Sequence, residues 1–318
     1  MSKLLVSPSP HIATARTTKS IMFEVCLALM PAVIASAILF GWRALAVIGV
    51  GVVAAVLSEY LFNVICKREQ TVGDFSAAVT GLLLALNLPA NIPLWQTALG
   101  SVMAIIVVKC FFGGIGKNFA NPAITGRIFL LISFSTTMTE AVFPVFSKTD
   151  VNTSATAVDL VSNATPLATL SGQGGTLPSY LDLFLGNHGG ALGETCVLAL
   201  LLGGIYLMIR RIISWHTPVV FIATVFVLTA LLGQDAFAHI LSGGLFIGAF
   251  FMATDYVTTP NTAWGKVIFG FGCGVITVLI RVFGSYPEGV SFSILLMNIL
   301  TPYIDRWTRT KPFGGVKA

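Results

Sequence analysis

A hydroxyl group in a polar segment is the first candidate for chemistry. The segment reads DLVSNATPLA over residues 159–168, and Thr165 stands between Ala164 and Pro166. Proline fixes its own φ and biases the residue before it towards an extended backbone, so we expect the threonine hydroxyl to point outward. The surrounding residues, about 135–188, are rich in Ser, Thr, Asn and Gly, which favours a solvated loop. The residues alone leave two interpretations, a displayed attachment site and a surface loop without function.

A glycine-rich stretch is the second candidate, with the sequence FFGGIGKNFANPAITGR at residues 111–127. Glycine allows close backbone approach, and Pro122 can begin a helix whose first N–H groups are free. Asn118 and Asn121 offer amide groups, and Lys117 offers a positive charge. The stretch lacks the P-loop pattern G-x-x-x-x-G-K-S/T. It predicts either a pocket for a polar, planar ligand or a helix break whose amides satisfy the backbone.

Acidic residues in apolar surroundings form the third candidate. The sequence MATDYVTTPN at residues 252–261 ends an apolar segment, and it includes Asp255 and Thr258. A carboxylate at membrane depth is costly and usually pairs, binds an ion or contacts a cofactor. The other acids in or beside apolar segments are expected to serve an ion path or to pair with Arg127, Lys109 or Lys67. They are Glu24, Glu59 and Asp74.

The composition indicates an integral membrane protein. Of the 318 residues, 55% are hydrophobic and only 10% are charged, whereas soluble proteins carry roughly 25% charged residues. The first 20 residues are polar and contain no apolar core of a signal peptide, so we expect the first apolar segment to remain as a helix.

We predict an all-α fold with ten transmembrane helices, each crossing with about 20 residues. Several of these segments are short or contain several glycines, which indicates close packing or broken helices. The predicted spans lie near residues 21–41, 43–66, 74–89, 95–113, 120–135, 190–209, 216–233, 238–254, 264–284 and 289–305.

The charges predict the orientation. Lys and Arg are concentrated in alternate connections, beginning with the N-terminal segment, and such residues favour the cytoplasmic side. We therefore expect both termini inside and the long polar loop outside. The predicted division is a first five-helix repeat at 1–135, an extracytoplasmic loop at 136–189 and a second five-helix repeat at 190–318. The net charge of +5 reflects the cytoplasmic bias and requires no nucleic-acid partner.

An internal repeat is predicted from two similar helices. Residues 98–113 can be laid against 269–284, where Arg281 is taken as the counterpart of Lys109 although it stands one position further along, and a tryptophan precedes each copy at Trp95 and Trp264. An odd number of helices per repeat inverts the second copy across the membrane, which is the plan of many transporters. The alternative is a chance likeness between apolar, glycine-rich helices.

The five cysteines predict no metal site, because they have no short mutual spacing. We expect them to be small buried hydrophobic residues. Cys110, near a helix end, leaves open a contact with a cofactor in a partner subunit.

These stretches together resemble a family of membrane proteins that includes the D subunit of Rnf electron-transport complexes. The B subunit of the sodium-pumping NADH:quinone oxidoreductase is more distantly similar. The resemblance covers nearly the whole chain. It is carried by Ser9-Pro10-His11, by GGIGKNFANPA at 113–123, by MATD at 252–255 and by DLVSNATPL at 159–167.

The resemblance implies a membrane protein that carries flavins in the bacterial cytoplasmic membrane. In that family a D-x-x-S/T-G-A-T pattern directs a flavin transferase to join FMN to the final threonine through a phosphoester, which corresponds to Thr165 here. Asn163 replaces the usual glycine, and asparagine tolerates the left-handed region better than most residues. A second near-match, DVNTSAT at 150–156, makes Thr156 the runner-up. We favour Thr165 because Pro-Leu-Ala follows it.

The resemblance also implies a second, non-covalent flavin, riboflavin or FMN, on the cytoplasmic side. Its candidate binding residues are Asn118, Asn121, Lys117, Asp255 and Thr258. The implied role is electron transfer across the membrane coupled to Na⁺ or H⁺ transport, within a ferredoxin:NAD⁺ type oxidoreductase. The implied partners are the other subunits of the complex, the flavin transferase and membrane lipid. No residue of this chain is predicted to complete catalysis alone.

Two other classes of function remain open at this point. One is a small-solute channel or transporter without a redox role, suggested by the repeat and the glycine-rich helices. The other is a passive scaffold for soluble redox partners. Both predict a colourless protein, whereas a flavoprotein is yellow.

Overall fold

A computed structural model describes residues 16–140, 142, 144, 165–171, 177–284 and 288–309. Within these ranges all regular structure is helical, and the only strand-like contact is an isolated bridge between Val142 and Gly190. The expected all-α class is therefore confirmed for the described part of the chain.

The described residues of the first half form five helical segments. Two of these segments include a turn of a different helix type. A 3₁₀ turn precedes α3, and α4 continues as the π-helix η2. The elements are α1 (Thr18–Phe40), α2 (Trp42–Ile65), η1 (Val72–Asp74), α3 (Ser76–Leu86), α4 (Leu94–Val102), η2 (Met103–Cys110) and α5 (Pro122–Ser133).

The described part of the second half also contains five helical segments, and its third segment is broken into three pieces that end in a π-helix. The elements are α9 (Val197–Ile209), α10 (His216–Leu231), α11 (Ala236–Leu241), α12 (Leu245–Ile247), η3 (Gly248–Met252), α13 (Ala263–Phe283) and α14 (Val290–Trp307). Short helices lie between the halves: α6 (Ser135–Thr139), α7 (Pro166–Leu170) and α8 (Tyr180–Leu185).

Three helices of the described residues, α1, α2 and α13, are long and apolar enough to cross a membrane. Most other predicted spans correspond to shorter apolar helices, and the predicted span at 238–254 corresponds to the broken set α11, α12 and η3. Both π-helices interrupt regular helix in glycine-containing or polar surroundings, a feature frequent at functional sites. The chain thus has the character of a multi-pass membrane protein.

The predicted span at 190–209 is wrong at its start. Helix α9 begins at Val197, and residues 187–196 are irregular. This segment runs along the end of α3, where the N–H of Leu192 donates to the carbonyl of Leu88 at 2.9 Å and that of Gly193 to Leu86 at 2.6 Å. Irregular backbone is stable at membrane depth only where protein groups satisfy its hydrogen bonds. The last residue of α3 and a residue just after it accept these two bonds.

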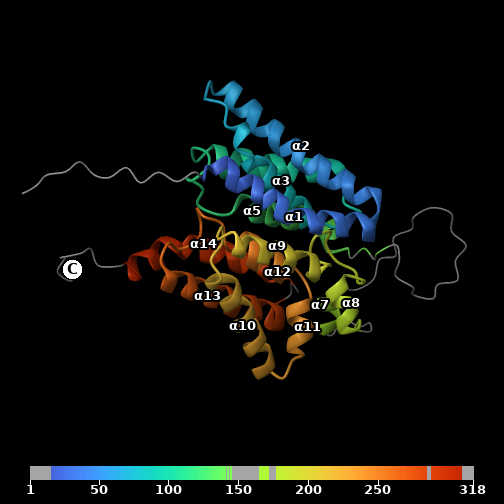
Figure 1. The fold of residues 1–318 in the computed structure, drawn as a ribbon. Helices are drawn as coiled ribbons and strands as arrows, with labels where there is room; N and C mark the ends of the chain where they lie inside the picture. The colour runs from blue at the N-terminus through green and yellow to red at the C-terminus, as the bar shows by residue number, and fades with distance from the viewer. Residues whose placement is uncertain are drawn as a thin grey trace, which may run out of the picture.

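The two halves pack against each other through α1 with α9 and α5 with α14 (Figure 1). One hydrophobic core runs across this junction and includes Leu29, Leu200 and Ile294. At the α1–α9 crossing, a Cβ on Gly203 would lie 2.0 Å from the carbonyl oxygen of Ala28. Only glycine permits this close approach between the halves.

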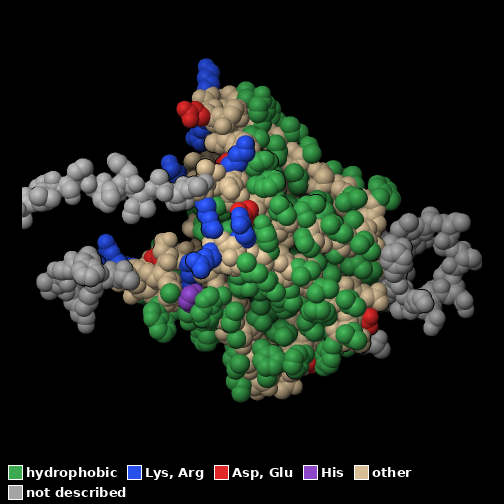
Figure 2. Space-filling view, in the orientation of Figure 1, with side chains coloured by type: hydrophobic (Ala, Val, Ile, Leu, Met, Phe, Trp, Pro, Cys, Tyr) green, Lys and Arg blue, Asp and Glu red, His purple; other side chains and the backbone are tan. Residues whose placement is uncertain are grey.

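The surface separates into an apolar belt and one basic end (Figure 2). Large exposed apolar side chains such as Trp42, Ile65 and Leu231 cover the helices. Lys and Arg gather at the end of the molecule where α1 begins and α14 ends, which we call the basic end. The short helices α7, α8 and α11 lie at the opposite end (Figure 1). Such a belt between polar ends matches the surface of a membrane protein.

The cysteines are all free, and Cys110 and Cys273 are buried as expected. The prediction is wrong for Cys66, which is exposed because it caps the end of α2. The described residues contain no group of three His, Cys, Asp or Glu side chains able to hold a metal ion.

Candidate functional site

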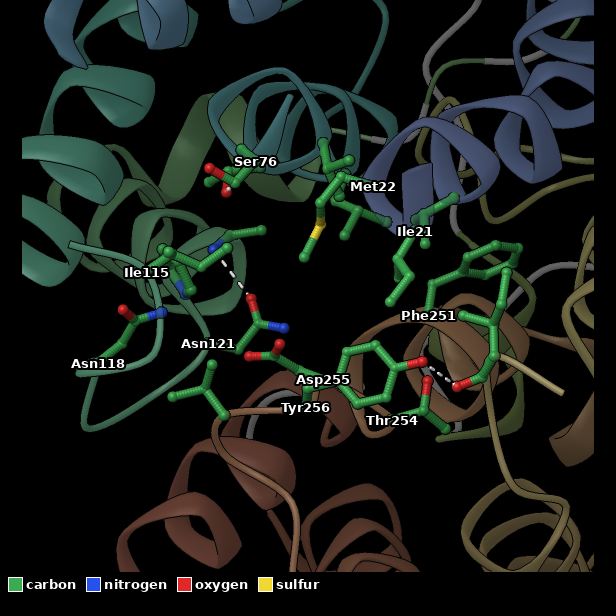
Figure 3. A pocket seen from close by; sticks show the side chains of 18 of the residues that line it. Ile21, Met22, Ser76, Ile115, Asn118, Asn121, Phe251, Thr254, Asp255 and Tyr256 are labelled. Atoms are coloured by element: carbon green, nitrogen blue, oxygen red, sulfur yellow. Dashed lines mark hydrogen bonds between the residues drawn. The ribbon is translucent and has the colours of Figure 1, made fainter. Parts of the chain in front are cut away.

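A cavity of about 340 Å³ lies at the junction of the two halves, near the basic end. The first half contributes the beginnings of α1, α3 and α5 and the turn after η2, and the second half contributes the ends of α9 and η3. Three predicted site residues from segments far apart in the sequence line it: Asn118, Asn121 and Asp255. In Figure 3 the side chains of Asn121 and Asp255 lie side by side on one wall, with Ser76 and Met22 across the cavity.

Asn121 is held by the start of α5. Its Oδ1 accepts hydrogen bonds from the N–H groups of Ala123 at 3.0 Å and Ile124 at 3.4 Å, and Pro122 occupies the first helical position. This is an N-cap, the favoured role of asparagine before a proline-initiated helix. The Nδ2 of Asn121 donates to the carbonyl of Met252 at 3.3 Å, which ties α5 to η3. Asn121 therefore joins the halves as well as lining the cavity.

Asn118 differs from Asn121 because its amide oxygen accepts no hydrogen bond from the described residues. Its Oδ1 is shielded from solvent and has no hydrogen-bond partner among the described residues. The preceding turn has positive φ at Gly113, Gly114 and Gly116, which glycine adopts without strain and which turns the chain back toward α5. An unpaired buried acceptor on a cavity wall is costly and suits a ligand that donates a hydrogen bond.

Lys117 does not line the cavity. Its side chain is exposed and lies over Gly113, where an added Cβ would meet Lys117 Cδ at 2.8 Å. The glycine-rich turn aims Asn118 inward and Lys117 outward, a direction that residue order alone does not reveal.

The second half supplies the wall formed by Thr254, Asp255 and Tyr256. The Tyr256 hydroxyl donates to the carbonyl of Ile212, which fixes its ring at the cavity edge (Figure 3). Thr258 is buried and outside the cavity lining, and its hydroxyl donates to Asp255 Oδ2 at 3.2 Å. Thr258 therefore positions Asp255 and does not reach the cavity.

A buried ion pair adjoins the same cavity. Lys109 Nζ lies 2.8 Å from both carboxylate oxygens of Glu59, and 2.6 Å from Ser76 Oγ. Lys109 and Ser76 line the cavity. Asp74 has no cation within ion-pair distance among the described residues and instead accepts from the hydroxyl and N–H of Ser76. Of the several pairings that the sequence allowed, that of Glu59 with Lys109 is confirmed.

Glu24 does not pair with any of the cations expected for it. It pairs with Arg210, at 2.7 Å from Glu24 Oε1 to Arg210 Nη2. The reason is the packing of α1 against α9, which brings the end of α9 beside the first turns of α1. A contact between residues so far apart in the chain cannot be predicted from hydropathy.

Arg127 forms a second polar cluster between the cavity and the opposite end. Its Nη1 donates to Ser291 Oγ at 2.9 Å and to Asn87 Oδ1 at 3.3 Å. Its Nη2 pairs with Glu288 and lies 3.8 Å from Glu194 Oε2. Asn87 in turn contacts Met252 Sδ at 3.9 Å. Polar contacts thus run from the Arg127 cluster to the residue that Asn121 binds.

Thr165 lies at the opposite end from the cavity, where it caps α7 (Figure 1). Its Oγ1 accepts a hydrogen bond from the N–H of Ala168 at 3.2 Å, and the residue is half-buried. Leu167 anchors α7: a Cβ on Gly243 would lie 2.5 Å from Leu167 Cδ1 and 3.1 Å from Arg281 Nη2. The motif residues 159–164 and Thr156 lie outside the described residues.

The chain is similar to known proteins over nearly its whole length. A family model described as the NQR2, RnfD, RnfE family matches residues 5–314. The D subunit of the Na⁺-translocating ferredoxin:NAD⁺ oxidoreductase complex of Acetobacterium woodii is 47% identical over 317 residues, covering 99% of this chain and 96% of the relative.

Two further relatives agree. The D subunit of the proton-translocating ferredoxin:NAD⁺ oxidoreductase complex of Clostridium ljungdahlii is 44% identical, over 97% of this chain and 96% of that protein. The D subunit of the ion-translocating oxidoreductase complex of Escherichia coli is 38% identical, over 98% of this chain and 99% of that protein. Because the family model spans almost the whole sequence and all three relatives match end to end, this chain belongs to the NQR2, RnfD, RnfE family.

Proposed function

We propose that this chain is the membrane flavoprotein subunit of an ion-translocating oxidoreductase of the ferredoxin:NAD⁺ type. It transfers electrons across the membrane between a covalent FMN on Thr165 and a second flavin in the cavity. The observation that carries the proposal is the cavity itself, which joins the glycine-rich signature to the MATD signature and is lined by Asn118, whose Oδ1 has no hydrogen-bond partner among the described residues. Relatives named as subunits of such complexes support it.

The lining of the cavity suits an isoalloxazine ring. Binding sites for small molecules are typically apolar with a few placed polar groups, and their volumes begin near 300 Å³. Met22, Leu83 and Phe251 offer apolar contact, and Ser76, Asn118 and Asp255 lie at the edges. Asn118 Oδ1 can accept from a ring N–H. We propose riboflavin or FMN as the occupant.

Thr165 is proposed to hold FMN through a phosphoester to Oγ1, made by a flavin transferase. The support is the D-x-x-S-x-A-T-P-L pattern and the position of a hydroxyl at the beginning of a helix. The proline at the first helical position and the buried Leu167 hold the attachment point in a fixed orientation.

We further propose ten spans as two inverted repeats, with the basic end in the cytoplasm and the Thr165 end outside. The support is the clustering of Lys and Arg at one end in Figure 2 together with the positive-inside rule. Both termini then lie in the cytoplasm, and the membrane is the bacterial cytoplasmic membrane.

In the proposed mechanism a flavin supplies reversible electron transfer at each end of the chain. The residues around the cavity exclude water and fix the orientation of the ring, and Thr258 holds Asp255 beside it. A hydrocarbon core of about 30 Å is too wide for efficient direct transfer between the two ends. Transfer would therefore need intermediate redox centres from other subunits of the complex, or a path between the helices that brings the Thr165 end closer to the cavity. The Arg127 cluster lies between the cavity and the Thr165 end, along the second of these two paths.

The test of the cofactors is intact mass and flavin analysis of the full chain co-expressed with its native flavin transferase. We expect one FMN adduct by mass, fluorescence in denaturing gels and a second flavin released on acid precipitation. Thr165→Val should abolish the adduct, whereas Thr169→Val, on the same short helix, should retain it. An adduct that persists in Thr165→Val, or that maps to Thr156, refutes the assignment. A colourless wild-type chain indicates the small-solute transporter instead.

The test of coupling is Asp255→Asn in the reconstituted complex. We propose that the Asp255 carboxylate stabilises a transient cation near reduced flavin, because opposite charges interact strongly where water is scarce. The variant should lose cation uptake and flavin reduction together. Asp305→Asn, which changes an acid on α14 that accepts from the N–H of Asn261, is the matched control. Wild-type rates of both processes in Asp255→Asn would assign that residue a structural role.

A further inference from the structure

Lys109 is a buried cation on the wall of the cavity, and the proposed mechanism does not yet use it. Its side chain is 2% exposed and that of Glu59 is 1% exposed. Lys109 lies in the π-helix η2, which begins at Met103. π-Helical segments frequently occur at functional sites because they reorient one turn of side chains.

Stability alone does not account for this pair. Removing two charges from water costs several kcal/mol per ion, so that replacing a buried pair by apolar residues is often neutral or stabilising. The arrangement is also asymmetric. Lys109 and Ser76 line the cavity, whereas Glu59 lies behind Lys109 on α2 and does not. The ammonium group therefore stands between the carboxylate and whatever occupies the cavity.

Glu59 has a second hydrogen-bond partner, which lies on the side away from the cavity. The hydroxyl of Thr71 donates to Glu59 Oε1 at 2.6 Å, and Thr71 itself accepts from Asn63 Nδ2 at 3.1 Å. Thr71 is exposed, in the connection between α2 and η1 at the basic end. A buried carboxylate thus has one hydrogen-bonded residue between it and water.

We propose that Lys109 and Glu59 form a charge-compensating pair, in which Lys109 stabilises negative charge on the cavity flavin and Glu59 then binds a monovalent cation. The inference rests on the proposed cavity flavin. One electron arrives from a one-electron redox centre of a partner subunit, and the flavin gains one negative charge. Lys109 interacts with that charge, and one H⁺ or Na⁺ enters past Thr71 to the Glu59 carboxylate. The net charge of the site is unchanged, and both steps reverse on reoxidation.

The physical reason is the low dielectric of the site. Opposite charges attract far more strongly there than in water, so one ammonium cannot fully compensate two anions at once. Added negative charge in the cavity weakens the hold of Lys109 on Glu59, and a carboxylate without its countercharge must take up a cation. The contacts run from Thr71 to Glu59, then to Lys109 and the cavity. The cation can therefore reach the pair from the side of Thr71, and the electron from the side of the cavity.

The test is a potentiometric titration of the full chain in detergent, in a Thr165→Val background so that only the cavity flavin contributes. Lys109→Met should lower the midpoint potential by about 59 mV, which is a tenfold loss of preference for the reduced form in a one-electron couple. Lys109→Arg should retain most of the potential. Lys67→Met, which removes an exposed lysine at the same end, should leave it unchanged. If Lys109→Met fails to fold, Glu59→Gln/Lys109→Met removes both charges and should show the same loss.

The cation is identified by repeating the titration while either Na⁺ concentration or pH is varied alone. The wild-type potential should rise with one of the two cations, and Glu59→Gln should abolish that dependence. An unchanged potential in both Lys109 variants, or a retained cation dependence in Glu59→Gln, overturns the inference. A chain without flavin in the Thr165→Val background refutes the proposed cofactor itself, which is a distinct result.

Discussion

Lys109 in the first half and Arg281 in the second half are both buried cations beside a helix break. Lys109 contacts Ser76 at the start of α3, after the turn η1. Arg281 donates to the carbonyl of His239 at 2.5 Å, within α11, and to that of Ser242 at 3.2 Å, just after α11. Each cation therefore fixes the chain where the third helical segment of its half begins or is broken.

Their partners differ. Lys109 has the Glu59 carboxylate in contact, whereas no carboxylate of the described residues lies within ion-pair distance of Arg281. Carbonyl dipoles can hold a guanidinium in place, but they do not cancel its charge. Arg281 is thus suited to fixing the end of α11. Lys109, whose partner is a carboxylate that a cation can neutralise, is suited to exchanging charge. The two buried cations thus differ in whether a carboxylate neutralises them.

The largest expected effect is on stability at the Lys109 end. Lys109→Met leaves Glu59 buried without its countercharge and should cost about 3–5 kcal/mol. Arg281→Met leaves two carbonyls short of hydrogen bonds and should cost about 1–3 kcal/mol. Thermal unfolding of the full chain in detergent gives the order, and Glu59→Gln/Lys109→Met should recover most of the loss. A larger loss for Arg281→Met would show that the carbonyl-bound cation is the more important one.

A smaller effect is expected at two glycines with positive φ, one in each half. Gly243 has φ 70° and Gly113 has φ 110°. Alanine costs about 1–2 kcal/mol in the left-handed region at either position. At Gly243 the added Cβ also meets buried Leu167, whereas at Gly113 it meets the flexible, exposed Lys117. Gly243→Ala should therefore unfold at the lower temperature and carry less covalent flavin on Thr165, and equal losses in both variants would contradict this difference.

The sequence was sufficient to predict the helical membrane class and several residues that line the cavity. Glycine turns and membrane-depth acids are visible as residue types, so Asn118, Asn121 and Asp255 could be selected before their positions were known. Side-chain direction could not be predicted, because neighbouring residues of one turn point in opposite directions, as Asn118 and Lys117 do. Ser76 was missed because a serine before an apolar run carries no distinctive signal.

The sequence also could not predict which acid pairs with which cation. Several acids and several cations were compatible, and only helix packing assigns Lys109 to Glu59 and Arg210 to Glu24. The irregular segment before α9 was predicted as helix because it is apolar. Apolar composition indicates burial, but it does not indicate the backbone geometry. Its hydrogen bonds to Leu86 and Leu88 depend on a helix from the other half of the chain. The Thr165 site remains a prediction, since most of its motif lies outside the described residues.

The smallest expected effect separates two asparagines that line the cavity. Asn121 caps α5 and binds the carbonyl of Met252, so Asn121→Ala should cost about 1 kcal/mol from the lost cap and should also reduce the non-covalent flavin. Asn118 makes no such bond through Oδ1. Asn118→Ala should leave the unfolding temperature of flavin-free chain unchanged, because no protein contact of Oδ1 is lost, and should still lower flavin content.

The two measurements are flavin content after gel filtration and thermal unfolding of the flavin-free chain. Asn118→Asp is the sharper variant, since a carboxylate keeps an acceptor at nearly the same position and should retain more flavin than alanine. Unchanged flavin content in both Asn118→Ala and Asn121→Ala would remove this wall from the binding site. A loss of stability in Asn118→Ala equal to that in Asn121→Ala would instead assign Asn118 to the scaffold of the turn, and the unpaired acceptor would then have no ligand to explain it.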